Sequence, residues 1–347
     1  MPASTNRIGV LLPTWIGDSC MATPALAALR SGFPDAEIVI IARPVVAQLL
    51  DGLQHAESGR LFDRVITYNK RTWLQRYALS KRLQHASLDS IILLTNSWWS
   101  AAAAWLGAVP TRVGYSGDVR SWLLTHSEAM PAGKNGPSRT ALPPIDYYLR
   151  LVGSIGCETH DRRMKLVCRP EDQAAADELW SELEFNNELP TLVVNNNAAT
   201  ERARCWPANK MQELVELVAN ELNWNVLLHC GPGERDMANS IAARIGSRQI
   251  RSMGLRADLP ISLSKAVLKK AELVVSTDSG PRHMAVALDR PVVSIFGATD
   301  PKVTQTYNTP ERIINHSNGR MDALSVEEVF TAVRDACESL TENVKVA

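Results

Sequence analysis

The sequence predicts an α/β protein made of two doubly wound domains, each a parallel sheet covered by helices. Short apolar, β-branched runs alternate with longer amphipathic segments, which is the pattern of consecutive βαβ units. The alternation begins afresh at Thr191, after a boundary region at residues 155–188. A length of 347 residues agrees with two domains, because one domain takes about 150 residues.

The first domain follows this alternation from its start. Strands are expected where β-branched and apolar residues dominate, at residues 8–12, 37–42, 64–68, 89–94 and 112–115. Helices are expected after the first strand up to residue 30, and at residues 45–50, 72–83, 100–106 and 145–153. The start of the first helix stays open, because Pro24 would remove a hydrogen bond inside a helix but suits a first helical position. Residues 130–144 lack periodicity and are rich in Pro and Gly, which predicts a loop.

The second domain repeats the pattern. Its strands are expected at residues 192–195, 225–228, 273–276, 292–296 and 312–315. Its helices are expected at residues 170–183, 209–220, 235–245, 262–270, 283–288 and 325–340. We therefore assign residues 1–170 to an N-terminal domain, 171–325 to a C-terminal domain and 326–347 to a closing helix.

Residues 271–301 form the stretch around which the chain is organised. They hold a strand, a tight turn at residues 277–280, a helix opened by Pro281 and a second strand. In open α/β sheets ligands bind beyond the carboxyl ends of the strands, where a helix N-terminus offers N–H groups to an anion. The expected ligand of this turn is a phosphate.

Two side chains of this stretch have more than one interpretation. Asp278 would repel a phosphate, so it is either the cap of the following helix or an acceptor for a sugar or ribose hydroxyl. His283 could donate a hydrogen bond to a phosphate oxygen, or it could be a buried histidine with a structural partner. Local pattern leaves both questions open.

Three further loops carry candidate residues at the carboxyl ends of predicted strands. Asp18 follows the first strand and is either a helix N-cap or a carboxylate facing the ligand crevice. Arg202 and Arg204 follow the first strand of the second domain; surface arginines are usually solvated, but guanidinium groups also bind phosphate bidentately. Glu234, after a Gly-Pro-Gly turn, could accept from ribose hydroxyls or could be an acidic residue of the first helical turn.

Trp98, Trp99 and Trp105 lie within eight residues of one another. Packing in a core or between domains is one explanation. A platform for a sugar or lipid acceptor, or a patch facing a membrane, is the other.

Composition excludes several classes of protein. Lys plus Arg equals Asp plus Glu at 37 each, so no global field favours nucleic acid, which leaves only a local basic patch as an alternative. The six cysteines show no metal-ligand or disulfide spacing, which favours a reducing cytoplasm. No apolar run reaches the ~18 residues of a spanning helix, and the N-terminus is a poor signal peptide. A role at a membrane would therefore be peripheral.

Motifs along the whole chain resemble the ADP-heptose lipopolysaccharide heptosyltransferases, and those of the first domain look most like heptosyltransferase II. Each motif is unspecific alone, but their order and spacing are specific. They are Pro13-Thr14-Trp15-Ile16-Gly17-Asp18 with Thr23-Pro24-Ala25-Leu26, Asn96-Ser97, Arg112-Val113-Gly114-Tyr115, Cys205-Trp206-Pro207, Thr277-Asp278-Ser279-Gly280 with His283, and Phe296-Gly297-Ala298-Thr299-Asp300-Pro301.

The resemblance implies a GT-B fold, with two Rossmann-like domains facing across a cleft. It implies an inverting, metal-independent enzyme that moves heptose from ADP-heptose to the lipopolysaccharide inner core, without a cofactor. Such a protein is expected in the cytoplasm, at the inner face of the inner membrane, with no nucleic acid partner. The alternatives are a GT-B transferase or epimerase with another sugar nucleotide, and a non-catalytic saccharide-binding relative.

The resemblance also assigns residues, with Asp18 as the catalytic base. Arg204 stands where the family usually has a lysine on the donor phosphates, so the charge is kept but the geometry differs. The remaining donor contacts implied are Asn197, Glu234, Asp278, Ser279, Gly280 and His283. The acceptor contacts implied are Gly17, Asn96, Ser97 and Arg120, and no metal ligand is expected.

Overall fold

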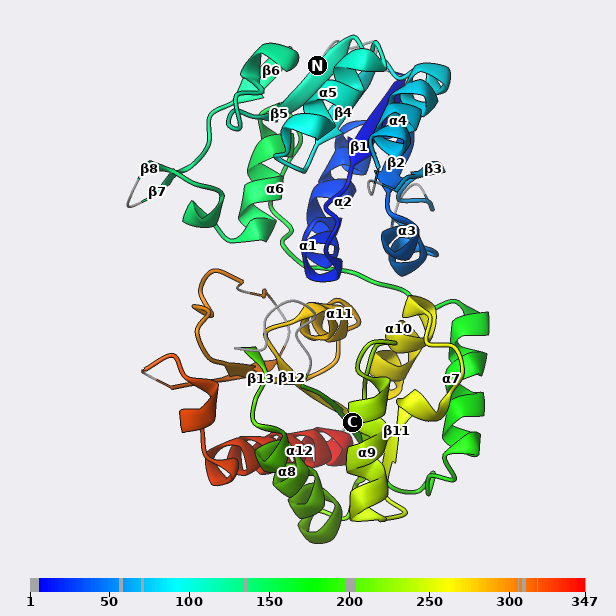
Figure 1. The fold of residues 1–347 in the computed structure, drawn as a ribbon, viewed down its shortest axis with the longest axis vertical. Coiled ribbons are helices and arrows are strands. Elements are labelled where there is room, and N and C mark those ends of the chain that lie inside the picture. Colours follow the sequence, from blue (N-terminus) through cyan, green and yellow to red (C-terminus); the bar gives the residue numbers. More distant parts are fainter. Residues whose placement is uncertain are drawn as a thin grey trace. The chain divides into compact units, whose positions relative to one another are not determined.

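The computed structural model describes residues 6–55, 59–69, 72–133, 136–196, 204–304, 306–307, 310–316 and 318–346. The chain forms two compact units. The first comprises Met1–Val167 with Val303–Tyr307, and the second Cys168–Lys302 with Asn308–Ala347 (Figure 1). Both units are α/β, as the sequence predicts.

The first unit is built on a six-stranded parallel sheet of order β3-β2-β1-β4-β5-β6. The strands are β1 Arg7–Leu11, β2 Glu37–Ala42, β3 Arg64–Thr67, β4 Ser90–Leu93, β5 Thr111–Tyr115 and β6 His126–Glu128. The central strands are almost entirely buried, as expected for apolar runs covered on both faces. The five predicted strands are confirmed. The edge strand β6 was not predicted, because it is short and largely exposed.

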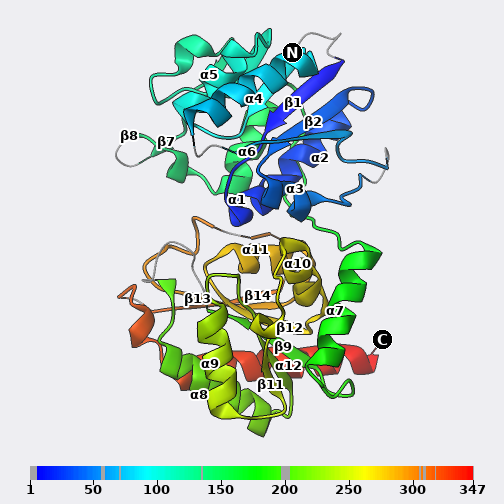
Figure 2. The ribbon, with the colours of Figure 1, turned by 45° about the vertical axis from the view of Figure 1, so that its right-hand side comes forward.

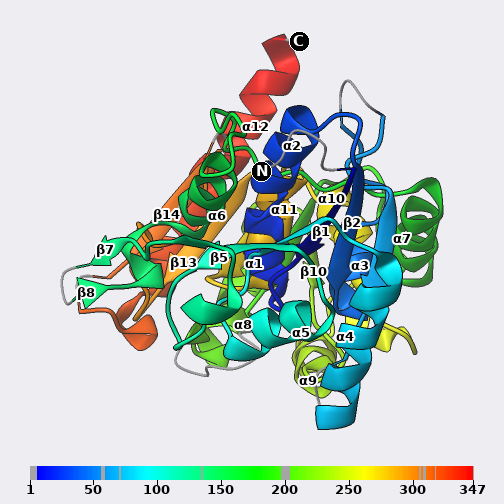
Figure 3. The ribbon, with the colours of Figure 1, turned by 90° about the horizontal axis from the view of Figure 1, so that it is seen from above.

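Helices cover both faces of this sheet. They are α1 Ile16–Met21, α2 Thr23–Gly32, α3 Pro44–Leu50, α4 Trp73–Ala86, α5 Trp98–Leu106 and α6 Pro144–Gly153. Helices α4 and α5 pack on each other and, with strands β1, β2 and β4, enclose one apolar core. Figure 3 shows both helices on the side of the sheet away from α2 and α6.

The segment after β1 forms two helices instead of one. They meet at Ala22, and Pro24 lies in the first turn of α2, where its missing N–H costs no helical bond. Residues 130–144 also hold more structure than the predicted loop. They contain a small antiparallel pair, β7 Ala132–Gly133 and β8 Gly136–Pro137, and a 3-10 turn at Arg139–Ala141.

The second unit repeats the topology, with a parallel sheet of order β11-β10-β9-β12-β13-β14. Its strands are β9 Thr191–Asn195, β10 Asn225–Leu228, β11 Ile250–Ser252, β12 Leu273–Thr277, β13 Val292–Phe296 and β14 Glu311–Asn315. Its helices are α7 Pro170–Glu182, α8 Ala208–Glu221, α9 Arg235–Ile245, α10 Ile261–Lys270, α11 Gly280–Ala287 and α12 Val326–Val346. Figure 2 shows α10 and α11 on one side of this sheet and α8, α9 and α12 on the other.

The strand order places the candidate sites. In both sheets the order reverses beside the first strand of the unit, between β1 and β4 and between β9 and β12. Ligands of doubly wound sheets bind beyond the carboxyl ends of the strands at such a reversal. Asp18 follows β1 and Asp278 follows β12, so each candidate carboxylate lies at the reversal of its own sheet. Among the described residues, no helix is long and apolar enough to cross a bilayer.

Candidate active site

Asp18 lies in the first turn of α1, and its carboxylate faces a loop far away in the sequence. The N-cap position of α1 is Trp15, which makes no side-chain cap, so the helix-cap explanation for Asp18 is wrong. Arg139 donates from Nη2 to Asp18 Oδ1 at 2.8 Å and to Tyr148 Oη at 3.0 Å. Burial raises the pKa of Tyr148, so the phenol stays neutral beside this ion pair. Arg139 therefore holds the side chain that the family resemblance assigns as a base.

Sequence reasoning missed Arg139. It belongs to residues 130–144, whose composition indicated only a loop, and it is 121 positions from Asp18. The only available signal was a basic residue in a Pro- and Gly-rich segment. Asp18 and Gly17, its neighbour in α1, are otherwise placed as the strand-loop-helix pattern predicts.

Arg120 is fully buried and is not presented to an acceptor, which corrects the expectation of direct contact. Its guanidinium donates to Tyr115 O at 3.0 Å, to Thr95 O at 2.6 Å and to Asn96 Oδ1 at 3.2 Å. Burial lowers the pKa of Arg120 to about 10, so the group remains a cation near neutral pH. Arg120 thus holds the loop after β4 in shape.

That loop carries two more of the four predicted acceptor residues. Asn96 donates from Nδ2 to Tyr147 Oη at 2.7 Å. Ser97 occupies the N-cap position of α5 and accepts from the Ser100 amide at 3.3 Å. The tryptophans that follow, Trp98, Trp99 and Trp105, are exposed, so the explanation that they pack in a core is wrong.

Asp278 is buried between two guanidinium groups of the second unit. Its Oδ1 lies 3.5 Å from Arg282 Nη1, and its Oδ2 lies 3.6 Å from Arg204 Nη1. The N-cap position of α11 belongs to Ser279, so Asp278 is not the cap of that helix. The two guanidinium groups offset the negative charge of this carboxylate, which lessens its repulsion of a phosphate nearby.

Arg282 is a second residue that sequence reasoning missed. It is fully buried, donates from Nε to Glu311 Oε1 at 2.6 Å and stacks over the Phe296 ring at 4.7 Å. Its spacing of four residues from Asp278 on a helix start was the signal that could have revealed it. Arg282 joins α11 to the end strand β14.

Hydrogen bonds connect the carboxyl ends of β9, β10 and β12. Asn195 donates from Nδ2 to Ser279 Oγ at 2.8 Å, and its Oδ1 lies 3.3 Å from His229 Nδ1. Ser279 and Gly280 open α11, whose first N–H groups lie at this edge. Glu234 lies at the N-cap position of α9 and accepts from the Gly231 amide at 2.8 Å, a contact within its own turn. Asn197 lies outside the described residues.

The second unit buries two neutral histidines at this edge. Burial, with the charge of Arg282, lowers the pKa of His283 to about 3. Burial lowers the pKa of His229 to about 4. Both rings are therefore neutral near pH 7 and can serve as hydrogen-bond donors or acceptors there without charge.

These histidines predict a loss of stability in mild acid. Because the ordinary pKa of histidine is 6.5, the unfolded chain binds protons below that pH while the folded chain does not. The free energy of unfolding should therefore fall as pH drops below 6.5, by about 2 kcal/mol for each histidine at about pH 5. Denaturant titrations at pH 6.5 and at about pH 5 measure this difference in the free energy of unfolding.

Substitution separates these two histidines from other groups that titrate in the same range. The His229→Gln/His283→Gln variant should lose most of this pH dependence, whereas a substitution of the exposed His160 to Gln should keep it. If the free energy of unfolding fell equally with pH in the parent protein and in both variants, neither buried ring would resist protonation.

Within the described part of the chain, no group of three or more His, Cys, Asp or Glu side chains is placed to hold a metal ion. The two sheets of matching order, each with its polar cluster at the reversal of strand order, define the architecture of GT-B glycosyltransferases. The family model of glycosyltransferase family 9 (heptosyltransferase) matches residues 76–333, and the chain belongs to this family. The predicted family and fold class are thereby confirmed, and the protein is a glycosyltransferase.

Individual relatives agree with this assignment. The chain is 24% identical to lipopolysaccharide heptosyltransferase 2 of Salmonella typhimurium, over 90% of this chain and 89% of the relative. A family 9 glycosyltransferase from Veillonella parvula superposes with a TM-score of 0.84 at 18% identity, covering 99% of each chain. Escherichia coli ADP-heptose lipopolysaccharide heptosyltransferase II superposes with a TM-score of 0.79 at 20% identity, covering 97% of this chain and 99% of that one. A UDP-GlcNAc 2-epimerase of Methanocaldococcus jannaschii reaches a TM-score of 0.50 at 12% identity, covering 94% and 92%.

Proposed function

We propose that this protein transfers heptose from ADP-heptose to the inner core of lipopolysaccharide, with inversion at the anomeric carbon and without a metal ion. Family membership and the names of its relatives support the substrate class. Two superposable structures are of E. coli heptosyltransferase WaaC, one with ADP and one with ADP-2-deoxy-2-fluoro heptose. The observation that carries the proposal is the cluster of Arg204, Asp278 and the start of α11 at the reversal of the second sheet.

This cluster has the chemistry that a nucleotide diphosphate needs. The first N–H groups of α11 and the positive end of its dipole attract an anion. Arg204 is partly exposed and close enough to Asp278 to be held by it, so its guanidinium is oriented before a ligand binds. A fixed cation at the leaving diphosphate would stabilise the charge that develops as ADP departs. Arginine and helix dipole would then do the work that a metal ion does in other transferases.

Asp18 supplies the complementary group in the first unit. In a single displacement the acceptor hydroxyl attacks the anomeric carbon, its proton passes to the Asp18 carboxylate, and ADP leaves with the electrons of the broken C–O bond. A base placed in this way contributes about 10² to 10⁴-fold to the rate. Arg139 is the positioning residue, because it holds Asp18 from a separate loop. Asn96 and Ser97, kept in shape by Arg120, are the proposed acceptor contacts.

Calorimetry with three nucleotides tests the donor. We expect selective binding of ADP over UDP and GDP in the presence of EDTA, since the proposed site uses no metal. The Arg204→Ala variant should bind ADP about tenfold more weakly or worse, because it loses a charged phosphate contact. An Arg244→Ala variant is the control, since Arg244 is exposed on α9. Preference for UDP would move the function to another transferase or to an epimerase.

A further inference from the structure

The tryptophans of the two units differ sharply in exposure. All six in the first unit are exposed by 38–70%, whereas the three in the second unit are exposed by at most 8%. The exposed ones are Trp15, Trp73, Trp98, Trp99, Trp105 and Trp122, and the buried ones are Trp180, Trp206 and Trp224. A tryptophan normally buries a large apolar area, so this many left in water on one unit indicate a partner.

Five of these six lie on α4, on α5 and on the turn that follows β5. Trp73 begins α4, Trp98 and Trp99 begin α5, and Trp105 lies in the last turn of α5. The ring of Trp105 contacts that of Trp122, edge to face, with the centroids 6.2 Å apart. The opposite sides of α4 and α5 pack in the apolar core that covers the sheet. The exposed rings are therefore not needed to fold the unit.

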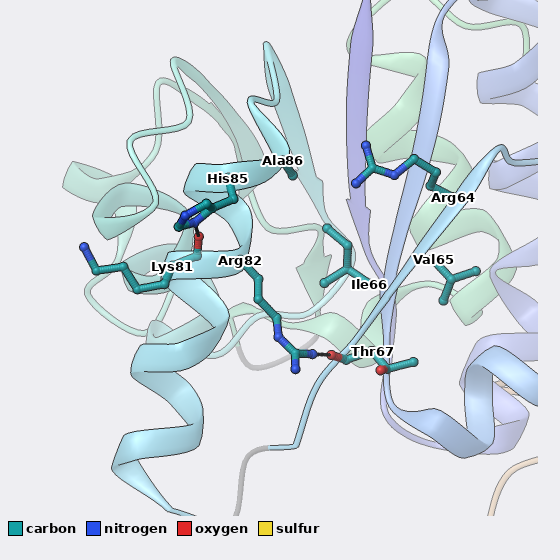
Figure 4. Close-up of a pocket in the computed structure, with 8 residues that line it drawn as sticks. All are labelled: Arg64, Val65, Ile66, Thr67, Lys81, Arg82, His85 and Ala86. Carbon is teal, nitrogen blue, oxygen red and sulfur yellow. Dashed lines mark hydrogen bonds between the residues drawn. The ribbon is translucent and has the colours of Figure 1, made fainter.

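The outer side of α4 and the neighbouring strand β3 also carry basic side chains. Residues 64–88 contain six Lys or Arg and no Asp or Glu in the sequence. Of the cations whose side chains the structure describes there, Arg64 pairs with Glu37 at 3.1 Å, and Lys81 and Arg82 are exposed on α4. Arg64 of β3 and Lys81, Arg82 and His85 of α4 line a hollow of about 480 Å³ whose other walls include Val65 and Ile66 (Figure 4). Trp73, Tyr77 and Lys81 follow one another at intervals of four residues on α4, so they share one side of the helix. The Nζ of Lys81 lies 5.7 Å from the centre of the Tyr77 ring.

We propose that this outer layer, which we call the α4–α5 surface, docks on an anionic lipid bilayer. It consists of Trp73, Tyr77, Lys81, Arg82, Trp98, Trp99, Trp105 and Trp122. Tryptophan and tyrosine favour the boundary between headgroups and acyl chains, and basic residues are drawn to anionic headgroups. The inference deepens the proposed function, on which it rests in one respect: an acceptor carried by a lipid requires the enzyme at the membrane surface.

The extent of the surface favours a bilayer over a saccharide. A crossover helix runs antiparallel to its strands, so Trp98 lies toward the carboxyl edge of the sheet and Trp105 toward the amino edge. A sugar platform would be confined to the carboxyl edge, where Asp18 and Asn96 lie. A second copy of the chain is disfavoured because two such basic surfaces would repel each other.

Flotation with vesicles tests the proposal without any nucleotide or acceptor. The protein should float with vesicles of phosphatidylethanolamine and phosphatidylglycerol and much less with phosphatidylcholine alone. Lys81→Gln/Arg82→Gln should weaken binding roughly 10- to 30-fold, since each basic residue near an anionic surface contributes independently. Trp105→Ser/Trp122→Ser should weaken it at least as much. Brominated phospholipids should quench the fluorescence of the parent protein.

Matched substitutions in the second unit serve as controls. Arg244→Gln/Arg248→Gln removes two exposed charges, and Met237→Ser/Leu255→Ser removes two exposed apolar side chains. Both should float like the parent protein. All variants should keep the parent melting temperature and ADP affinity, which shows that they are folded.

Besides a failure to float at all, three results would overturn the inference. They are equal flotation with both kinds of vesicle, unchanged flotation of the α4–α5 variants, and a dimer in light scattering that Trp105→Ser/Trp122→Ser dissociates. The outcome is independent of the donor test. ADP binding without flotation would reject this inference alone, and flotation without ADP binding would reject the proposed function alone.

Discussion

Asp18→Asn should lower turnover by at least ~10²-fold while leaving ADP affinity unchanged, because the amide cannot accept the proton of the acceptor hydroxyl. The substitution keeps the shape of the side chain. Arg139 should stay in place, since it also donates to Tyr148 at 3.0 Å. The proposed donor contacts all belong to the other unit, so nucleotide binding should not respond. Single-turnover release of ADP from ADP-heptose, with lipopolysaccharide core as acceptor, measures the effect.

Asp146→Asn is the matched control. Asp146 is also a partly buried carboxylate of the first unit with an arginine partner, Arg162, at 2.6 Å, and it accepts a hydrogen bond from Tyr307. Its loss should cost little turnover, because nothing proposed for the reaction involves it. If both variants were equally slow, or if Asp18→Asn turned over within tenfold of the parent, another group would have to be the base.

Arg282→Met should destabilise the second unit by about 3–5 kcal/mol, which is the effect of removing one partner from a buried ion pair. Methionine has a similar length but leaves Asp278, which is buried, and Glu311, whose side chain is 7% exposed, without this cation. The free energy of unfolding in a denaturant titration reports the loss. ADP affinity should also fall, since Asp278 and the start of α11 lose their anchor.

Arg312→Met provides the contrast. Arg312 pairs with Asp335 at 3.0 Å, but both side chains are 43% exposed. Pairs of this kind contribute at most about 1 kcal/mol, so the variant should unfold nearly like the parent. Comparable losses for the two substitutions would mean that burial does not set the strength of the Arg282 pair.

The sequence was sufficient for ten of the twelve strands in the two six-stranded sheets and for the chain order of the polar loops. Central strands such as β2 and β13 are continuous β-branched runs, and such runs fold in one way when helices cover both faces. The strands that escaped prediction, β6 and β11, have three residues each, and the pairing of such short segments is set by their neighbours. Three residues are too few to show a period in the apolar pattern.

The contacts between distant residues could not be predicted. Arg139 and Asp18 meet across 121 positions, and no local pattern encodes such a meeting. The burial of Arg120 follows from carbonyl groups of the loop after β4 that only the folded chain brings together. Likewise, the alanines of α5 fill the core so completely that the tryptophans around them are turned outward. In each case the decisive partner is supplied by the tertiary fold.

The cysteines give the second unit a built-in attachment point for a probe. All six lie in the described part of the chain, none forms a disulfide, and five are buried. Burial raises the pKa of Cys157, Cys168 and Cys230 to about 11 and that of Cys337 to about 12, so these thiols hold little of the reactive thiolate. Cys205 is partly exposed and follows Arg204 directly. A maleimide dye should therefore label the native protein mainly beside the proposed donor site, and its emission would follow nucleotide arrival in real time.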